Sequence, residues 1–173
     1  MIATVGKFTL FLSLAFAIFQ FFISKKNTNP KLVSLCVNGL FFSSLLSFLI
    51  LIHLHITSDF SVLNVFQNSH SSKPLIYKIA GVWGNHEGSM LLWILVLTFF
   101  NYLIFKLLNK TNSEFVLKTL KTQGFISIGF ILFTVLTSNP FEKIASANAD
   151  GLGFNPILQD PALAIHPPLL YIG

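Results

Sequence analysis

Long apolar runs separated by short polar segments are the dominant pattern along this chain. A run of about 20 residues is long enough to cross the hydrocarbon core of a membrane as a helix. Four runs come near that length and predict transmembrane helices at residues 8–23, 32–56, 89–108 and 120–138. The last run reaches Leu120 only if Lys121 extends its side chain to the interface, because the uncharged core alone barely spans the membrane.

Two polar segments, residues 57–88 and 139–166, are predicted to be loops outside the membrane. An apolar sequence resumes at Pro167 and resembles the first turn of a fifth helix. The pattern therefore predicts an all-α, polytopic membrane protein with four transmembrane helices and the start of a fifth. Residues 1–173 are expected to form a single membrane unit.

Composition supports a membrane protein and excludes several other classes. Hydrophobic residues make up 53% of the chain and charged residues only 10%, whereas a soluble domain carries about 25% charged residues. The net charge of +5 is spread over loops, so no basic tract for nucleic acid is present. Cys36 is alone, which excludes an internal disulfide and a cysteine-based metal site. The run at 8–23 is longer than a signal peptide core and lacks a cleavage site, so it is predicted to be retained.

The lysines are distributed unevenly between the two sides of the membrane, and cytoplasmic loops typically carry the excess. One side gathers Lys25, Lys26, Lys31, Lys106, Lys110, Lys118 and Lys121 against Glu114. The other side holds Lys73, Lys78 and Lys143 against Asp59, Glu87, Glu142, Asp150 and Asp160. The lysine-rich side is therefore predicted to face the cytoplasm, which places the N-terminus and both long polar segments outside.

His166 is the first candidate site residue. A residue before proline is disfavoured in helical geometry, and Pro167 suits a first helical position. His166 is therefore expected at or near the N-cap of the fifth helix, on the outer face. One imidazole nitrogen could then bind a haem iron while the other donates to an acceptor. The alternative is an interfacial histidine that only caps a helix.

The segment from Trp83 to Ser89 is the second candidate. Gly84 and Gly88 allow close backbone approach, and Trp83 offers a flat apolar face that could form the wall of a porphyrin or quinone pocket. The alternative is an aromatic anchor at the membrane interface, followed by a helix start with Ser89 as N-cap.

Other titratable residues give weaker indications. His86 and Glu87 are either solvated or a ligand or proton pair. His53 and His55 lie about 200° apart on a helix, so they cannot share a ligand and are predicted to be interfacial. Asp160 is expected in a turn, with a lesser chance of orienting His166. No catalytic triad, phosphate loop or metal cluster is visible, and no acid lies in the four spans, which argues against an ion transporter.

Three motifs resemble segments of the CcmF-type cytochrome c haem lyases. Residues 83–93 are similar to that family's W-G-x-x-E-G-S-x-x-x-W segment. Residues 155–161 followed by 166–171 resemble its N-P-x-L-Q-D-P…H-P-P-L-L-Y segment, and residues 139–141 match its N-P-F. Order and spacing agree throughout, and the resemblance covers the whole chain.

The resemblance implies a role in attaching haem covalently to c-type cytochromes, at the bacterial inner membrane or the mitochondrial inner membrane. In that family a CcmE-type chaperone delivers haem, and the thiols of apocytochrome c add to its vinyl groups on the outer face. A CcmH-type thiol partner and the remainder of the lyase are also implied. His166 occupies the position of an external axial haem ligand in that family, and Trp83 is expected to form part of the wall of the haem pocket. No catalytic residue is assigned.

Departures from the family limit what this chain is expected to do alone. It lacks the family's tryptophan-rich WWD segment, the second external histidine and the membrane histidines that hold a b-type haem. The chain is therefore expected to be the N-terminal portion of a lyase, either truncated or one part of a split enzyme, and inactive alone. Alternatives are a non-catalytic scaffold that docks CcmE or apocytochrome, the related haem lyase for nitrite reductase and, more weakly, a transporter subunit.

Overall fold

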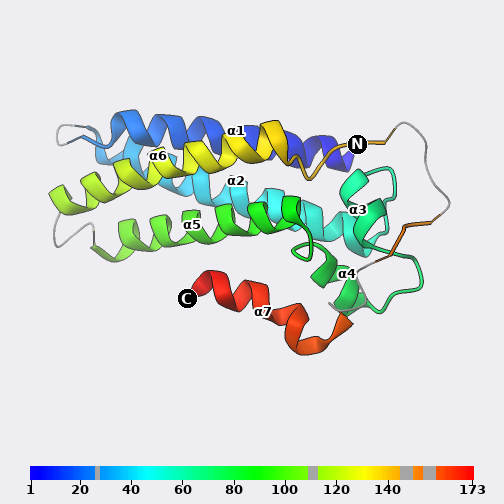
Figure 1. Ribbon diagram of the computed structural model, residues 1–173. Helices are drawn as coiled ribbons and strands as arrows, with labels where there is room; N and C mark the ends of the chain where they lie inside the picture. The colour runs from blue at the N-terminus through cyan, green and yellow to red at the C-terminus, as the bar shows by residue number, and fades with distance from the viewer. Residues whose placement is uncertain (26–27, 109–112, 145–149, 154–158) are drawn as a thin grey trace.

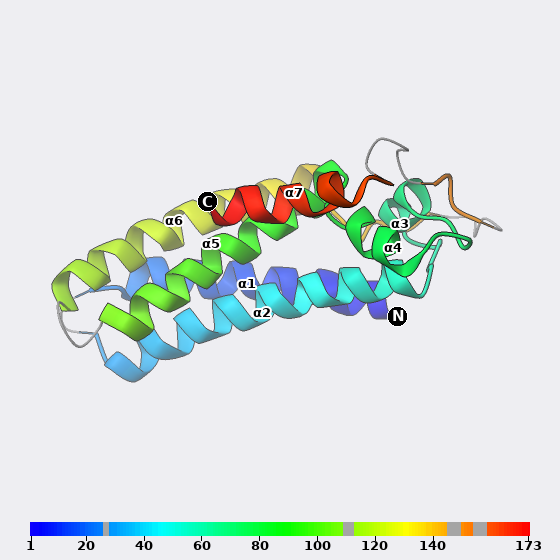
Figure 2. The ribbon, with the colours of Figure 1, turned by 90° about the horizontal axis from the view of Figure 1, so that it is seen from below.

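The computed structural model describes residues 1–25, 28–108, 113–144, 150–153 and 159–173. Within these ranges the regular elements are helices, apart from one isolated bridge between Val62 and Lys143. The long helices lie side by side as a bundle (Figures 1 and 2). They are α1 (Ile2–Ile23), α2 (Pro30–Ile56), α5 (His86–Leu108) and α6 (Ser113–Thr137). In the described part of the chain these four are long and apolar enough to cross a membrane, which confirms the all-α prediction.

Three of the four long helices begin well before the apolar run that predicted them. α1 begins at Ile2, α5 at His86 and α6 at Ser113, whereas the runs begin at residues 8, 89 and 120. A membrane helix continues into the interface wherever polar residues allow it. In α6 the extra turns carry an ion pair between Glu114 and Lys118 at 2.9 Å, a spacing that supports a helix.

Buried polar side chains join the helices of the bundle. Gln20 of α1 and Asn101 of α5 are both fully buried and exchange two hydrogen bonds, at 3.1 and 2.9 Å. Gln20 also donates to the Leu120 carbonyl of α6 at 2.8 Å, so one side chain connects three helices. Ser13 of α1 and Ser43 of α2 share a hydrogen bond of 2.8 Å. Such contacts satisfy groups that lipid cannot.

The polar segment 57–88 is not only a loop. It forms two short helices, α3 (Leu63–Asn68) and α4 (Leu75–Gly81), at one end of the bundle (Figure 1). The second polar segment is attached to the first through backbone bonds, from Leu63 N–H to the Glu142 carbonyl and from Ile144 N–H to the Ser61 carbonyl. The described parts of these two segments therefore form one polar cap at this end of the bundle.

The last helix, α7 (Pro161–Ile172), begins six residues earlier than predicted. Its N-cap is Asp160, whose carboxylate accepts hydrogen bonds from the backbone N–H groups of Ala162 and Leu163 at 2.9 and 3.1 Å. Asp is a strong N-cap residue and Pro161 suits the first helical position, so this pair starts the helix instead of the pair at 166–167. α7 lies along α5, outside the four-helix bundle (Figure 2).

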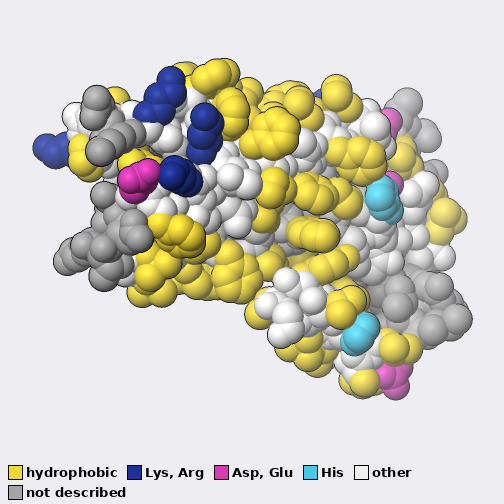
Figure 3. All heavy atoms as spheres, turned by 60° about the vertical axis from the view of Figure 1, so that its left-hand side comes forward, with side chains coloured by type: hydrophobic (Ala, Val, Ile, Leu, Met, Phe, Trp, Pro, Cys, Tyr) yellow, Lys and Arg dark blue, Asp and Glu magenta, His cyan; other side chains and the backbone are white. Residues whose placement is uncertain are grey.

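Charged side chains separate to the two ends of the bundle. Lysines gather at one end with a carboxylate among them, while the other carboxylates and the histidines in this view are seen at the opposite end (Figure 3). The apolar surface between them includes large exposed side chains such as Phe8, Phe125 and Leu136. This arrangement fits a bundle whose middle contacts lipid and whose ends contact water.

Candidate functional site

The two faces of α7 differ in burial. Ala164 is only 3% exposed, while Pro167, Pro168 and Tyr171 are partly buried. These positions follow the spacing of one helix face, and this face contacts α4 and α5. His166 lies two residues after Ala164, about 200° around the helix, and is exposed. The imidazole is therefore on the side of α7 that faces away from the bundle.

His166 itself is a free ligand donor. No hydrogen bond, ion pair or ring contact links its imidazole to another residue in the described ranges. The sequence-based placement was wrong in one respect, since His166 is inside α7 and does not cap it. The acceptor expected for its second nitrogen is likewise not found among the described residues. Both ring nitrogens are therefore accessible on the side of α7 that faces away from the bundle.

Trp83 contacts the opposite, inner face of α7. Its indole N–H donates a hydrogen bond of 2.7 Å to the backbone carbonyl of Ala164. In an uninterrupted helix that carbonyl would accept from the N–H four residues later, but residue 168 is proline and has none. The indole N–H therefore takes the place of the missing backbone donor. Ala80 of α4 completes this contact as a buried neighbour of Ala164.

A second tryptophan contacts α7 seven residues further along. The Trp93 ring stacks on the Tyr171 ring, with centroids 5.8 Å apart and an interplanar angle of 28°. Its other partner is Phe130 of α6, at 5.1 Å and 28°. Both tryptophans of the chain thus contact the helix that carries His166.

The backbone around Trp83 is closely tied to the start of α5. The Asn85 side chain accepts from the N–H of Gly88 at 2.8 Å, which is the hydrogen bond of an N-cap. Ser89 had been expected to cap the helix, but its hydroxyl instead donates to the carbonyl of Trp83 at 2.6 Å. Asn85 also donates to the Gly81 carbonyl at 2.7 Å. These bonds make the support of the indole short and stiff.

Gly88 is required by a close approach of two backbone segments. A Cβ at this position would lie 1.5 Å from the Val82 carbonyl oxygen, which is far inside van der Waals contact. Only glycine allows α5 to begin this close to the turn that carries Trp83. The sequence had indicated close approach here, without indicating what approaches.

The remaining histidines occupy different environments. His86 is exposed and its ring contacts Phe133 edge-on at 6.0 Å, while Glu87 accepts a 3.4 Å hydrogen bond from Asn64. His53 is exposed, as an interfacial residue would be. His55 is fully buried, with Nδ1 bonded to the Leu51 carbonyl and Nε2 lacking a partner. The interfacial prediction for His55 was wrong, because α4 packs against this end of α2, where a Cβ at Gly81 would lie 3.3 Å from the His55 ring.

The donor set fits one axial ligand of a haem iron. A single neutral imidazole is the usual axial donor, and exposed apolar residues such as Leu163, Leu169 and Leu170 surround it on the outer surface of α7. The described residues contain no group of three or more His, Cys, Asp and Glu side chains that could hold a bare metal ion. The structure does not bring Trp83 and His166 together. Trp83 contacts the inner face of α7, whereas His166 lies on the opposite, exposed face.

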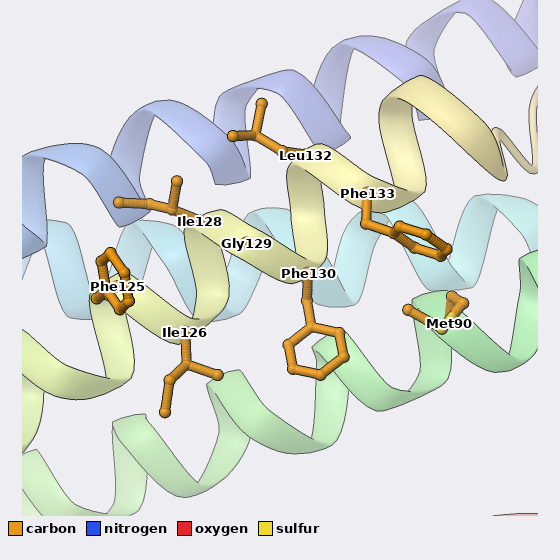
Figure 4. A pocket seen from close by; sticks show the side chains of 8 residues that line it. All are labelled: Met90, Phe125, Ile126, Ile128, Gly129, Phe130, Leu132 and Phe133. Carbon is orange, nitrogen blue, oxygen red and sulfur yellow. The ribbon is translucent and has the colours of Figure 1, made fainter.

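An apolar groove lies elsewhere, on the α5–α6 surface. It encloses about 590 Å³ and is lined by α6 side chains, with Met90 contributed by α5 (Figure 4). No charged side chain, hydroxyl or amide lines it. Lipid chains or another membrane helix fit such a surface, and it contributes nothing to the chemistry around His166.

One stretch of the candidate motif lies outside the described residues. Residues 154–158 include the Asn-Pro-Ile-Leu part of the segment before α7. Asp160 and Pro161, which follow it, are described and start the helix. The sequence reasoning missed the contact between Trp83 and Ala164. Its signal was present in the proline four residues after Ala164, which leaves a carbonyl that another donor must satisfy.

Together these features define an integral, multi-helix membrane protein that presents an exposed imidazole on a helix outside the bundle, and this helix is braced by tryptophans. Residues 83–173 match the family described as "Cytochrome C assembly protein", which is more than half of the chain. The chain belongs to this cytochrome c assembly family. The matched region contains α5, α6, α7 and the Trp83 segment.

Curated relatives agree with the family. The chain is 46% identical over 179 residues to the cytochrome c-type biogenesis protein CycK of Rhizobium meliloti, covering 100% of this chain and 26% of the relative. It is 41% identical over 181 residues to CcmF of Haemophilus influenzae, covering 100% and 28%. The chain thus spans about a quarter of the length of these relatives.

A solved structure shares the fold. The chain of "Cytochrome c Heme Lyase CcmF" superposes with a TM-score of 0.78 at 24% identity, covering 99% of this chain and 28% of that one. The arrangement of the bundle, the cap and α7 is therefore one that this larger protein also contains.

Proposed function

We propose that this chain is the part of a cytochrome c haem lyase that presents His166 as one axial ligand to haem on the outer face of the membrane. The observation that carries the proposal is the exposed, unpartnered imidazole on the outward side of α7, in a chain of the cytochrome c assembly family. When bound, haem supplies the iron and the vinyl groups to which cysteine thiols of apocytochrome c add.

The residues of this chain contribute orientation and environment in this proposal. His166 would hold haem through one ring nitrogen, and the neighbouring exposed leucines would exclude water from that side of it. The polar cap built from α3 and α4 keeps this end of the bundle in the aqueous phase. The lysine-rich opposite end supports an orientation with α7 outside the bacterial or mitochondrial inner membrane.

Completion of the site requires other parts of the lyase. The relatives are about four times as long as this chain. We assign the second axial ligand and the surface that covers haem to the parts of the lyase that this chain does not match. The proposed partners are a CcmE-type haem chaperone, apocytochrome c and a CcmH-type thiol protein. Haem would then lie between the outer side of α7 and those segments.

A maturation assay tests the proposal. With the rest of the lyase supplied, His166→Ala should abolish covalent haem attachment to a reporter cytochrome c, measured as haem-stained protein on a denaturing gel. His53→Ala removes another exposed histidine and is the matched control, which should leave maturation unchanged. Normal maturation with His166→Ala would contradict the ligand role. It would favour a scaffold, whose partner capture should depend on the outer segments.

The related lyase for nitrite reductase is the second candidate. A relative named NrfE, from Haemophilus influenzae, is 37% identical over 182 residues and covers 100% of this chain. The same presentation of His166 would serve either lyase. Expression with each reporter apocytochrome separates the two, because only the true substrate should acquire covalent haem.

A further inference from the structure

We infer that Trp83 is a positioning residue, which fixes the direction of His166 by holding the inner face of α7 through the Ala164 carbonyl. The inference deepens the proposed function and rests on His166 as a haem ligand. It gives Trp83 a role different from the haem-pocket wall that its flat ring first indicated. Three structural observations support it.

The first observation is a weak point in α7 at the position of His166. Pro167 and Pro168 have no N–H, so the carbonyls of Leu163 and Ala164 lack their usual donors within the helix. A helix that lacks two consecutive hydrogen bonds bends easily. The bend would fall between residues 163 and 168, which flank His166 directly. Without an external donor, the direction of the imidazole would be poorly defined.

The second observation is that Trp83 supplies an external donor from a stiff support. Its indole N–H donates to the Ala164 carbonyl at 2.7 Å. Its own carbonyl accepts from Ser89, and Gly88 lets α5 start against Val82. The tryptophan side chain combines a large apolar ring with an N–H donor, so it can pack and donate at the same time. Phenylalanine could fill the space but could not donate.

The third observation is that α7 is held at two separate points. Trp83 contacts it at Ala164, and Trp93 stacks on Tyr171, which lies about two turns further along. One contact alone would leave the helix free to rotate about it, whereas two contacts fix both rotation and tilt. His166 lies between these points but on the outward face, so the tryptophans act on it through the helix.

The test removes the indole N–H donor of Trp83 and keeps an aromatic ring at this position. In the complete lyase, Trp83→Phe should retain haem but broaden the low-spin electron paramagnetic resonance signal and shift the haem midpoint potential, because His166 would adopt several orientations. A haem-free readout accompanies it. Hydrogen–deuterium exchange in the α7 peptide of the full chain in nanodiscs should become about tenfold faster, as expected for a buried carbonyl that loses its donor.

Pro168→Ala separates positioning from simple satisfaction of a carbonyl. Alanine at 168 supplies an N–H to the Ala164 carbonyl within the helix. In a Trp83→Phe background it should restore slow exchange in α7 but not the sharp resonance signal, because the hydrogen bond from the turn between α4 and α5 to α7 stays absent. Restoration of both would overturn the inference and leave Trp83 as a structural donor only.

Two further outcomes separate this inference from the proposed function. Unchanged exchange in Trp83→Phe would overturn the positioning role even if His166→Ala abolishes haem binding. Haem spectra that are unchanged in His166→Ala would overturn the ligand role and the inference with it. Faster exchange in Trp83→Phe would then show only that Trp83 braces α7.

Discussion

Single missing atoms decide much of the local structure of this chain. Gly88 lacks a Cβ, and that lets α5 begin against the Val82 carbonyl. Pro168 lacks an N–H, and that leaves the Ala164 carbonyl to Trp83. Both residues are visible in the sequence, where Gly88 indicated close backbone approach and the missing N–H of Pro168 went unused. The groups that use the space or the free carbonyl lie elsewhere in the chain, so a local pattern could not identify them.

Replacing Gly88 by alanine tests the close approach. Gly88→Ala should lower the unfolding temperature clearly, because an overpacked core costs about 1–3 kcal/mol. Gly129→Ala is the matched control in α6, since a Cβ there meets no atom within 4 Å. Cys36 is buried and is the sole cysteine, so its reaction with a fluorogenic maleimide reports unfolding. Equal melting curves for the two variants would show that the approach is not tight.

Asp150 provides a pH-dependent attachment of the outer cap. Hydrogen bonds from the Ser71 hydroxyl and backbone N–H lower the pKa of Asp150 from 3.8 to about 2, with smaller contributions from Gly151 N–H and His70. A depressed pKa means that the attachment is complete above the unfolded value and is lost as pH falls through about 2. Protection of the Ser71 amide should therefore persist at pH 4 and disappear near pH 2. A carboxyl that titrates at its ordinary value would contradict this attachment.

At the scale of helices, existence was predictable and boundaries were not. Apolar length alone identified the four bundle helices, because lipid requires such runs. The start of α7 was misplaced because Asp160-Pro161 and His166-Pro167 both resemble a cap followed by a first-turn proline. The carboxylate of Asp160 can accept two N–H groups, and this decides between them. The helical turns within 57–88 were missed because they are short and mixed in polarity.

The Gln20–Asn101 pair should be the strongest polar contact between bundle helices. Asn101→Leu should destabilise the bundle by about 1 kcal/mol, because the buried Oε1 of Gln20 loses its donor while its Nε2 keeps only the Leu120 carbonyl. The double change with Gln20→Met should recover part of that loss. Asn38→Leu is the control, since within the described ranges Asn38 hydrogen-bonds only to Ser34 of its own helix. Maleimide melts through Cys36 measure the wild type, both single changes, the double change and Asn38→Leu, and additive effects of the two single changes would contradict a direct pair.

At the scale of the whole molecule, the bundle separates a lysine-rich end from an end that carries the cap and α7 (Figure 3). The candidate site joins two segments that are far apart in the sequence, since Trp83 and Ala164 are separated by 81 residues. Motif matching identified each segment but not their contact, because the contact depends on how α7 packs against α4 and α5. The side of α7 on which His166 lies likewise followed only from that packing.

Cysteine labelling tests the predicted orientation. In a Cys36→Ser background, Leu75→Cys in the exposed part of the cap should react with an impermeant maleimide applied to the outer side of intact cells. Glu114→Cys, at the opposite end, should react only after permeabilisation. The reverse pattern would place the cap and His166 in the cytoplasm, where they could not serve an outward-facing site.

The absorption spectrum of haem in the assembled lyase tests the central claim most directly. His166→Gly leaves a space for free imidazole on the outer side of α7, so the variant can be examined with and without the added ligand. We predict that the Soret band of the outer haem is lost in His166→Gly and returns when imidazole is added. A Soret band that is unchanged by the substitution, with or without imidazole, would contradict the assignment of His166 as an axial ligand.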